Sequence, residues 1–146
     1  MALLCSMVAG AVEIEPGVSQ KLAEQRRAAV GNLCYDLKFR IPASRKEKVT
    51  GSAVIKFTYK KCGDDLQLDF QGADGQYGGV VTVNGKKRRA EWRSEHIILK
   101  ESWLKNGENA VDVAFTSGDK SLNRNDDYLY TLFVPDHARS VFPCFD

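Results

Sequence analysis

The sequence predicts an all-β domain, built as a β-sandwich or as saddle-like curved sheets, with one short N-terminal helix. Three observations predict this fold. A good helical pattern occurs in one segment, 19–30. From Asn32 onward, apolar residues recur at every second position, which is the period of a half-buried strand. Short turns separate these strands, and no long linker, repeat or low-complexity tract interrupts them.

The composition is that of one ordinary globular domain. The chain has 146 residues, of which 43% are hydrophobic, 10% aromatic and 27% charged, and this length suffices to bury a core. The net charge of +2 is small, so charge gives no reason to expect a nucleic-acid partner. The apolar run 2–11 is too short to cross a bilayer, and we expect no membrane span.

Residues 1–18 precede the predicted β domain, 19–146. The apolar run ends in Ala9-Gly10-Ala11, the small-x-small pattern that signal peptidases cut. We interpret residues 1–18 as a signal-peptide remnant, which predicts a secreted, periplasmic or cell-envelope protein. The alternative is a disordered or docked N-terminal tail.

The helix is predicted to begin at Ser19, whose hydroxyl can cap it, and to end at Gly31. Its weak apolar face consists of Leu22, Ala29 and Val30. Its charged residues are expected to lie in solvent, and these are Lys21, Glu24, Arg26 and Arg27.

The rest of the chain is predicted to form strands joined by turns. The first strand ends at Pro42, and its apolar residues are Leu33, Tyr35, Leu37, Phe39 and Ile41. Asn84-Gly85 predicts a hairpin between 80–83 and 90–93. The Gly-rich loop 72–79 is interpreted as a hairpin or bulge, because a phosphate site would need a helix after it. The other predicted strands are 49–60, 66–70, 96–99 and 110–115, with one helical turn at 101–104.

The residues that usually carry chemistry do not form a motif here. His96 and His137 are the histidines, and neither lies in an H-E-x-x-H pair. A zinc site built from both with distant carboxylates is the less favoured alternative. The four cysteines could form up to two disulfides, but no spacing pairs them, so we treat Cys34, Cys62 and Cys144 as small hydrophobic residues. Burial of Cys144 would raise its pKa and make it unreactive.

Two charged stretches are interpreted as solvent-facing. The basic run Lys86 to Arg89 follows a hairpin turn, where charged arms protect a sheet edge, although such a run can also track a phosphate backbone. A cluster of residues with side-chain oxygens could bind calcium. The order of these residues does not match an EF-hand loop, so we predict a polar loop. The cluster consists of Asp119, Asn123, Asn125, Asp126 and Asp127.

The closing segment, Tyr128 to Asp146, is apolar and aromatic for nearly its whole length. One strand is predicted over 128–134 and the start of another over 141–145, with a turn at Pro135-Asp136 between them. Because domains rarely stop inside an apolar strand, we expect the native polypeptide to continue past Asp146.

The end of this segment carries a resemblance to a known family. Ala138-Arg139 followed by 142–146 resembles the A-R-x-x-F-P-C-F-D sequence of the aminopeptidase N family of zinc metallopeptidases. The runs 122–124 and 128–131 fit the family's approach to this point, and Val83-Asn84-Gly85 and 99–113 fit more loosely. The resemblance covers roughly residues 32–146.

The resemblance implies that this chain is the non-catalytic N-terminal β domain, truncated before its catalytic domain. The family's zinc ligands would all lie beyond Asp146, so the chain itself is expected to be no enzyme and to hold no metal or cofactor. The parent enzyme would hold zinc and remove N-terminal amino acids from peptides. The implied cleft-lining residues are Thr131, Leu132, Phe133 and Val134. The implied interdomain docking residues are Arg139, Phe142, Pro143, Phe145 and Asp146.

The sequence departs from the family where T-Q-F-E is common. Leu132 and Val134 replace the Gln and Glu that help to hold the substrate's amine, and neither side chain can accept a hydrogen bond. Nearby carboxylates could substitute, activity could be reduced or altered, or residues of the catalytic domain could suffice. We hypothesise the last.

Two rival interpretations remain. The chain could be a free-standing β-sandwich that binds carbohydrate or protein at a cell surface, with Trp92, Trp103 and Tyr77 as contact residues. It could also belong to an inactive peptidase relative that acts as a scaffold. In the favoured interpretation, the apolar face without its catalytic domain should make the chain prone to self-association.

Overall fold

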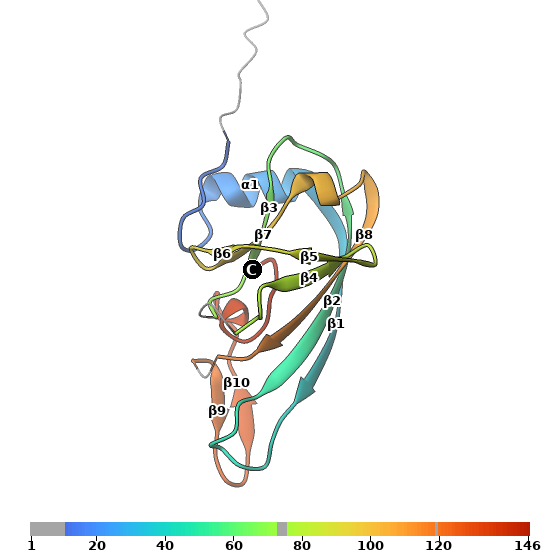
Figure 1. Cartoon of the computed structure of the whole chain (residues 1–146). Coiled ribbons are helices and arrows are strands. Elements are labelled where there is room, and N and C mark those ends of the chain that lie inside the picture. The colour runs from blue at the N-terminus through green and yellow to red at the C-terminus, as the bar shows by residue number, and fades with distance from the viewer. Residues whose placement is uncertain (1–10, 73–75, 119) are drawn as a thin grey trace, which may run out of the picture.

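The computed structural model describes residues 11–72, 76–118 and 120–146. Residues 2–10 of the apolar run 2–11 and Asp119 therefore lie outside the described residues, as does part of the Gly-rich loop. Figure 1 shows an elongated domain with the helix across one end and a hairpin at the other. The elements are α1 (Gln20–Ala29), β1 (Val30–Arg40), β2 (Thr50–Tyr59), β3 (Leu66–Asp69), β4 (Val80–Val83), β5 (Lys86–Arg89), β6 (Trp92–Arg93), β7 (His96–Leu99), η1 (Glu101–Trp103), β8 (Gly107–Thr116), β9 (Leu122–Arg124), β10 (Leu129–Thr131) and η2 (Ala138–Ser140).

The strands form a five-stranded sheet in the order β1-β2-β8-β4-β5, a three-stranded sheet in the order β3-β7-β6, and the pair β10-β9. All the strand pairs are antiparallel. The two larger sheets share one core, in which Ile55 and Val113 of the first meet Leu68 and Ile97 of the second. The prediction of an all-β fold with one short helix is confirmed.

The helix begins as predicted and ends differently. The Ser19 hydroxyl accepts a hydrogen bond from the Leu22 N–H at 3.3 Å, so the N-cap is confirmed. The helix ends at Ala29 and the chain runs straight into β1, so the prediction that Gly31 ends it is wrong. Gly31 lies within β1 instead, where the pairing with β2 shifts register before Cys34 and Asn32 takes a φ of 48°.

The three-stranded sheet is covered on its outer face by the N-terminal segment. Gln67 donates a hydrogen bond to the Glu13 carbonyl at 3.3 Å, and His96 Nε2 lies 2.9 Å from the Glu15 carbonyl. All four residues of β3 are buried, because this face and the core face are both packed. Residues 11–15 are thus docked on the domain.

The central hairpin confirms the turn and corrects one strand. Asn84 and Gly85, with φ values of 49° and 78°, join β4 to β5. The second arm is therefore Lys86–Arg89, and the prediction of 90–93 is wrong because a two-residue turn pairs the residues directly beside it. The basic run forms an edge of the five-stranded sheet, as its interpretation as a charged hairpin arm requires.

Candidate functional site

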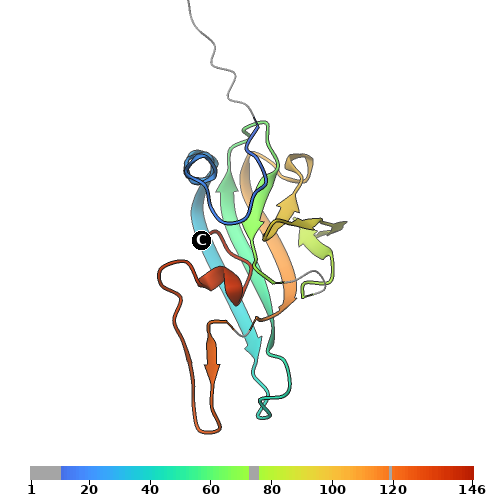
Figure 2. The same cartoon turned by 90° about the vertical axis from the view of Figure 1, so that its left-hand side faces the viewer.

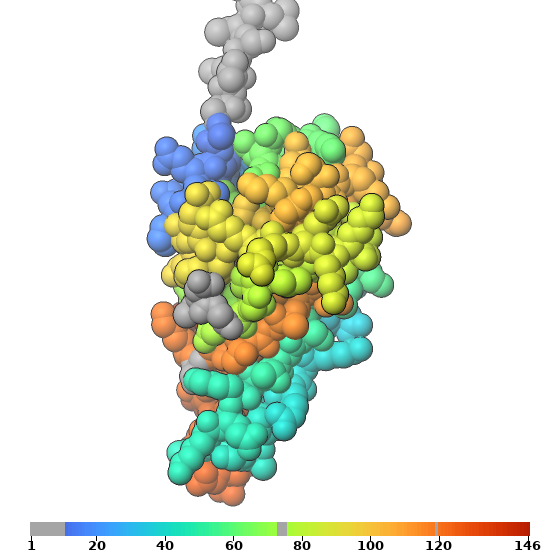
Figure 3. Space-filling model, in the orientation of Figure 1, coloured from blue at the N-terminus to red at the C-terminus, as the bar shows by residue number. Residues whose placement is uncertain are grey.

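The first half of the closing segment forms a small hairpin beyond the main sheets. Leu129 pairs with Arg124 and Thr131 with Leu122, so the strand predicted over 128–134 is shorter than expected. The Arg124 guanidinium donates hydrogen bonds to the carbonyls of Pro42, Ser44 and Glu47 at 2.8 to 2.9 Å. Figure 3 shows this hairpin (orange) and the loop before β2 (teal) together forming the narrow end of the domain.

Four apolar side chains at alternate positions of this half are exposed. We call them the β10 stripe; they are Tyr128, Tyr130, Leu132 and Val134, with 59%, 53%, 61% and 72% of their surface accessible. The two tyrosine rings stack with centroids 6.2 Å apart. Contiguous exposed apolar patches are common at interaction sites, so the β10 stripe is a candidate contact surface.

The implied cleft-lining residues divide between outward and inward positions. Thr131, Leu132 and Val134 are exposed, whereas the Phe133 ring turns inward and packs edge-on against Phe142 at 5.8 Å. Of the carboxylates that could replace a lost amine ligand, Asp136 is already bonded to Arg139 at 2.7 Å. The role of the implied cleft-lining residues in substrate binding stays a prediction.

The second half, 138–146, is built into the domain. Val141 lies in a small core with Val49 and Leu122. The strand predicted over 141–145 is wrong, because Cys144 makes only an isolated bridge to Asp69. The next ladder hydrogen bonds would involve residues 142 and 146, but the Phe142 N–H donates to the Ala138 carbonyl and the Asp146 N–H to the Asp69 carboxylate.

Serine hydroxyls fix the turn that leads into this half. Ser117 donates to the Val141 carbonyl at 2.9 Å, and the Ser140 hydroxyl lies 2.8 Å from that of Ser121. The backbones approach so closely that a Cβ on Gly118 would lie 2.6 Å from the Ser140 carbonyl oxygen. A residue larger than glycine at position 118 would therefore displace the closing segment.

Behind the closing segment lies the Asp69 cluster, which consists of Arg26, Asp69 and His96. Arg26 binds both oxygens of the fully buried Asp69 carboxylate, at 2.7 and 2.5 Å, and His96 Nδ1 lies 2.7 Å from one of them. The Asp146 N–H donates to the other oxygen at 3.0 Å. The prediction that Arg26 lies in solvent is wrong, because β3 places a buried carboxylate against its helix face.

Electrostatics favour the ionised Asp69. Burial by itself would raise the pKa of its carboxyl, but contacts with His96, with the Arg26 charge and with the Asp146 N–H outweigh it and hold the pKa below its usual value. The pKa of the Cys144 thiol is shifted in the opposite direction. Its pKa is raised by burial first and by the charges of Asp146 and Asp69 second, so it is a poor nucleophile.

The implied docking residues lie mostly inside this arrangement. Arg139 and Pro143 are buried, Phe142 and Phe145 are half-buried, and Asp146 is exposed. The Phe145 ring packs edge-on against Phe57 at 5.7 Å, with the Arg26 guanidinium 5.5 Å from its centroid. Contact of these residues with another domain stays a prediction. The surface available for such a contact consists of the exposed parts of Phe142 and Phe145 and of Asp146.

The other chemistry-bearing residues do not assemble into a site. His96 is fully buried and His137 is exposed, and the described ranges hold no group of three or more His, Cys, Asp or Glu that could bind a metal. Cys34 and Cys62 are exposed, so treating them as hydrophobic residues is wrong, whereas Cys144 is buried as expected. Helices able to cross a membrane are absent from the part of the chain that the structure describes.

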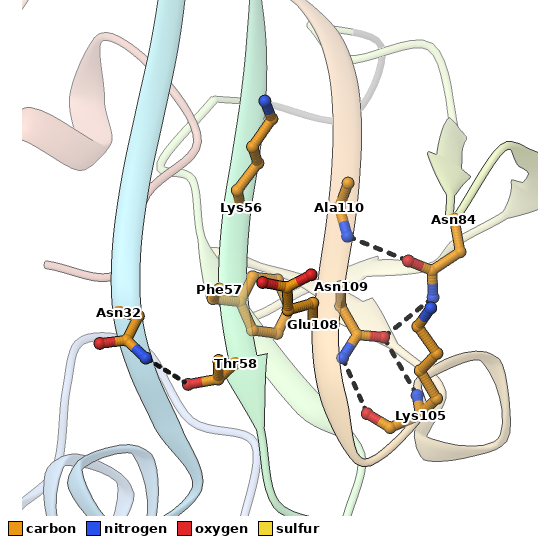
Figure 4. A pocket seen from close by; sticks show the side chains of 9 residues that line it. All are labelled: Asn32, Lys56, Phe57, Thr58, Asn84, Lys105, Glu108, Asn109 and Ala110. Carbon is orange, nitrogen blue, oxygen red and sulfur yellow. Dashed lines mark hydrogen bonds between the residues drawn. The ribbon is translucent and has the colours of Figure 1, made fainter.

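A polar hollow of about 690 Å³ lies on the five-stranded sheet (Figure 4). Its amides bind one another, since Asn84 donates to Asn109 at 2.9 Å and Asn109 donates to the Lys105 carbonyl at 2.8 Å. Its one aromatic ring among the described residues belongs to Phe57, which is buried. The hollow is therefore braced by its own hydrogen bonds and presents no ring on which a sugar would stack.

The three aromatic residues of the rival interpretation are not presented on loops for binding. Tyr77 is buried and donates to the Ala90 carbonyl, and the Trp92 indole donates to the Phe70 carbonyl at 2.8 Å. Trp103 packs against the core with Arg88 5.9 Å from its ring. All three are structural contacts.

The fold and the closing segment define a two-sheet β domain with an exposed β10 stripe at one end. No family model matches the sequence, and a search of the curated proteins finds no match. Among solved structures, native leukotriene A4 hydrolase from Saccharomyces cerevisiae shares the fold, with a TM-score of 0.61 and 22% identity. The similarity covers 82% of this chain and 22% of that enzyme.

The matched part of leukotriene A4 hydrolase is its N-terminal region, and that enzyme belongs to the aminopeptidase family that the closing motif resembles. The fold therefore confirms what the motif suggested about architecture. Because the chain spans about a fifth of the length of that enzyme, any activity of the whole protein is a proposal.

Proposed function

We propose that this chain is the non-catalytic N-terminal β domain of a zinc aminopeptidase. The observation that carries the proposal is the fold match, which covers most of this chain and only the N-terminal region of an aminopeptidase-family enzyme. The motif at 138–146 supports it, because in the family that it resembles this segment leads into the catalytic domain.

The zinc ligands and the general base belong to the catalytic domain in this proposal. There the metal would activate the attacking water, while this chain presents a wall of the substrate cleft. Secretion, suggested by the N-terminal segment, is part of the proposal.

The two halves of the closing segment support different parts of this role. The β10 stripe offers apolar surface that another domain can bury. The second half fixes the direction in which the chain leaves the domain, because the Asp146 N–H is bonded to buried Asp69. A rigid exit holds a following domain against the stripe.

Leu132 and Val134 shape the cleft without binding charge. Hydrogen bonds to charged groups contribute about 1.5–3 kcal/mol, and neither side chain can make one to the substrate ammonium. Recognition of the amine therefore falls to residues of the catalytic domain, and these two positions contribute apolar surface near the first side chain of the substrate.

The gene sequence downstream of Asp146 and the activity of its full-length product test the proposal. We expect a helix with H-E-x-x-H and release of N-terminal residues from aminoacyl nitroanilides, abolished by a zinc chelator and restored by zinc. The chain of 146 residues alone is the matched control and should release none. A downstream region without H-E-x-x-H, or activity in the isolated chain, would contradict the proposal.

A further inference from the structure

We propose that strand β1 is an interface through which two copies of this chain pair in antiparallel fashion. β1 has 11 residues and forms an edge of the five-stranded sheet, hydrogen-bonded to β2 on one side. Figure 2 shows it at the margin of that sheet. Edge strands are templates for pairing with another chain unless their side chains or neighbouring segments prevent it.

The free side of β1 is not closed by the segments around it. The nearest hydrogen bond from the closing segment goes from the Phe145 N–H to the Tyr35 hydroxyl at 2.8 Å. Within the described ranges, no hydrogen bond joins that segment to the β1 backbone. From Cys34 to Arg40 the pairing with β2 is regular, so this part of the edge is free of bulges.

Both faces of this edge carry side chains that a second copy could cover. On one face Leu33, Phe39 and Ile41 leave 40%, 38% and 54% of their surface exposed. The other face is polar and exposed, with Cys34, Asp36, Lys38 and Arg40. Apolar side chains left open at a free edge favour association.

The charges of β1 are self-complementary in one register. Two copies related by a two-fold axis perpendicular to the sheet place residues of the same face opposite each other. With Leu37 opposite Leu37, Asp36 of each copy faces Lys38 of the other. The same register sets Tyr35 opposite Phe39, so apolar side chains also meet on the face that carries Leu37 and Phe39.

The adjacent registers that keep the faces aligned are less favourable. A shift of the axis by one residue toward the N-terminus puts Asp36 opposite Asp36, and a shift toward the C-terminus puts Lys38 opposite Lys38. Like charges directly opposite in antiparallel strands are destabilising. The Leu37 register is the one of these three that has opposite-charge pairs and no like-charge pair.

The other edge of the same sheet cannot associate in this way. β5 consists of Lys86, Lys87, Arg88 and Arg89, so every register of a self-paired β5 opposes positive charges. Basic side chains protect an edge from pairing. Association is thereby directed to β1.

Sedimentation velocity of the 146-residue chain and five variants tests the proposal. Asp36→Lys and Lys38→Asp each turn two attractive pairs into two repulsive ones, and we expect each to weaken dimerisation by about tenfold. The double variant D36K/K38D restores the pairs and should recover wild-type dimerisation to within about threefold. Asp112→Lys is the matched control, because it makes the same charge change on an exposed residue of β8 and should leave the dimer unchanged.

Three results would overturn the proposal. One is a wild-type chain that stays monomeric over three decades of concentration. Another is a double variant that fails to recover while circular dichroism shows it folded. The third is Leu132→Ser dissociating the dimer, because that would place the contact on the β10 stripe. None of these results bears on the aminopeptidase assignment, which the downstream sequence decides.

Discussion

The two halves of the closing segment are both rich in apolar and aromatic residues, but they lie in opposite environments. Residues 128–134 carry the exposed β10 stripe, whereas 138–146 are tied to the Asp69 cluster, to the small core around Val141 and to two serine hydroxyls. Hydrophobicity alone therefore does not tell whether an apolar segment supports its own domain or offers a surface to another. The side chains and backbone groups that lie beside the segment in the folded chain decide which of the two occurs.

The difference has a structural reason. The second half crosses β3 and comes within hydrogen-bonding distance of Asp69, Tyr35 and Ser117. The first half lies beyond the end of the main sheet, where it pairs only with the short strand β9 among the described residues. Substitutions in the second half should accordingly cost stability, whereas substitutions in the exposed β10 stripe should leave it unchanged.

The largest effect is expected for Asp69→Ala. The substitution leaves the buried Arg26 guanidinium without its carboxylate, which costs about 3–5 kcal/mol in the free energy of unfolding. Urea denaturation at neutral pH measures it. The matched control is Asp65→Ala, which removes a partly exposed carboxylate paired with Lys100 at 2.7 Å and should cost less than about 1 kcal/mol. Equal losses in the two variants would show that the Asp69 cluster does not anchor the segment.

A smaller loss is expected for Phe142→Ala. The half-buried Phe142 ring packs against both cores and contacts Phe133 and Tyr35. Its truncation should cost about 2 kcal/mol, less than for a fully buried ring. Leu132→Ala on the stripe serves as the comparison and should stay within about 0.5 kcal/mol of wild type. A comparable loss for Leu132→Ala would mean that the stripe supports its own domain.

Acid should weaken the anchored half in particular. The folded-state pKa of Asp69 is lower than its unfolded value, so its contribution to stability is full above the unfolded pKa and declines as pH falls through the folded one. The urea concentration at the unfolding midpoint of the wild type should decrease as the pH is lowered below about 4. The midpoint of Asp69→Asn should decrease less steeply over the same range. Identical acid slopes would show that Asp69 has the same pKa in both states.

The smallest effect is expected for the pair Leu132→Gln and Val134→Glu. Both side chains are exposed, so the free energy of unfolding should change by less than about 0.5 kcal/mol. In the full-length protein, the affinity for substrates with a free amino terminus should change by less than about tenfold, because the catalytic domain supplies amine recognition. A larger gain would show that positions 132 and 134 do bind the amine.

Local signals in the sequence were sufficient for several of the elements. The Ser19 cap, the period-two alternation of β2 and β8 and the Asn84-Gly85 turn each act within a few residues, and each is present in the structure. The prediction that 90–93 is the second hairpin arm failed for a local reason, although Trp92–Arg93 does form strand β6 in the other sheet. The spacing of the apolar residues in 90–93 indicates which side chains are buried, and Ala90 and Trp92 do pack in or against the core. A two-residue turn, however, pairs the residues directly beside it, so these form the hairpin arm.

Contacts between distant residues decided the rest. Arg26 and Asp69 are 43 positions apart, and the Asp146 N–H reaches Asp69 across 77, so no window of sequence shows that a charged helix residue is buried. The sequence by itself determined the all-β class and the resemblance of its last residues to a family. Only the tertiary structure decided which half of the closing segment is anchored and which is exposed, because burial depends on what the whole chain brings alongside.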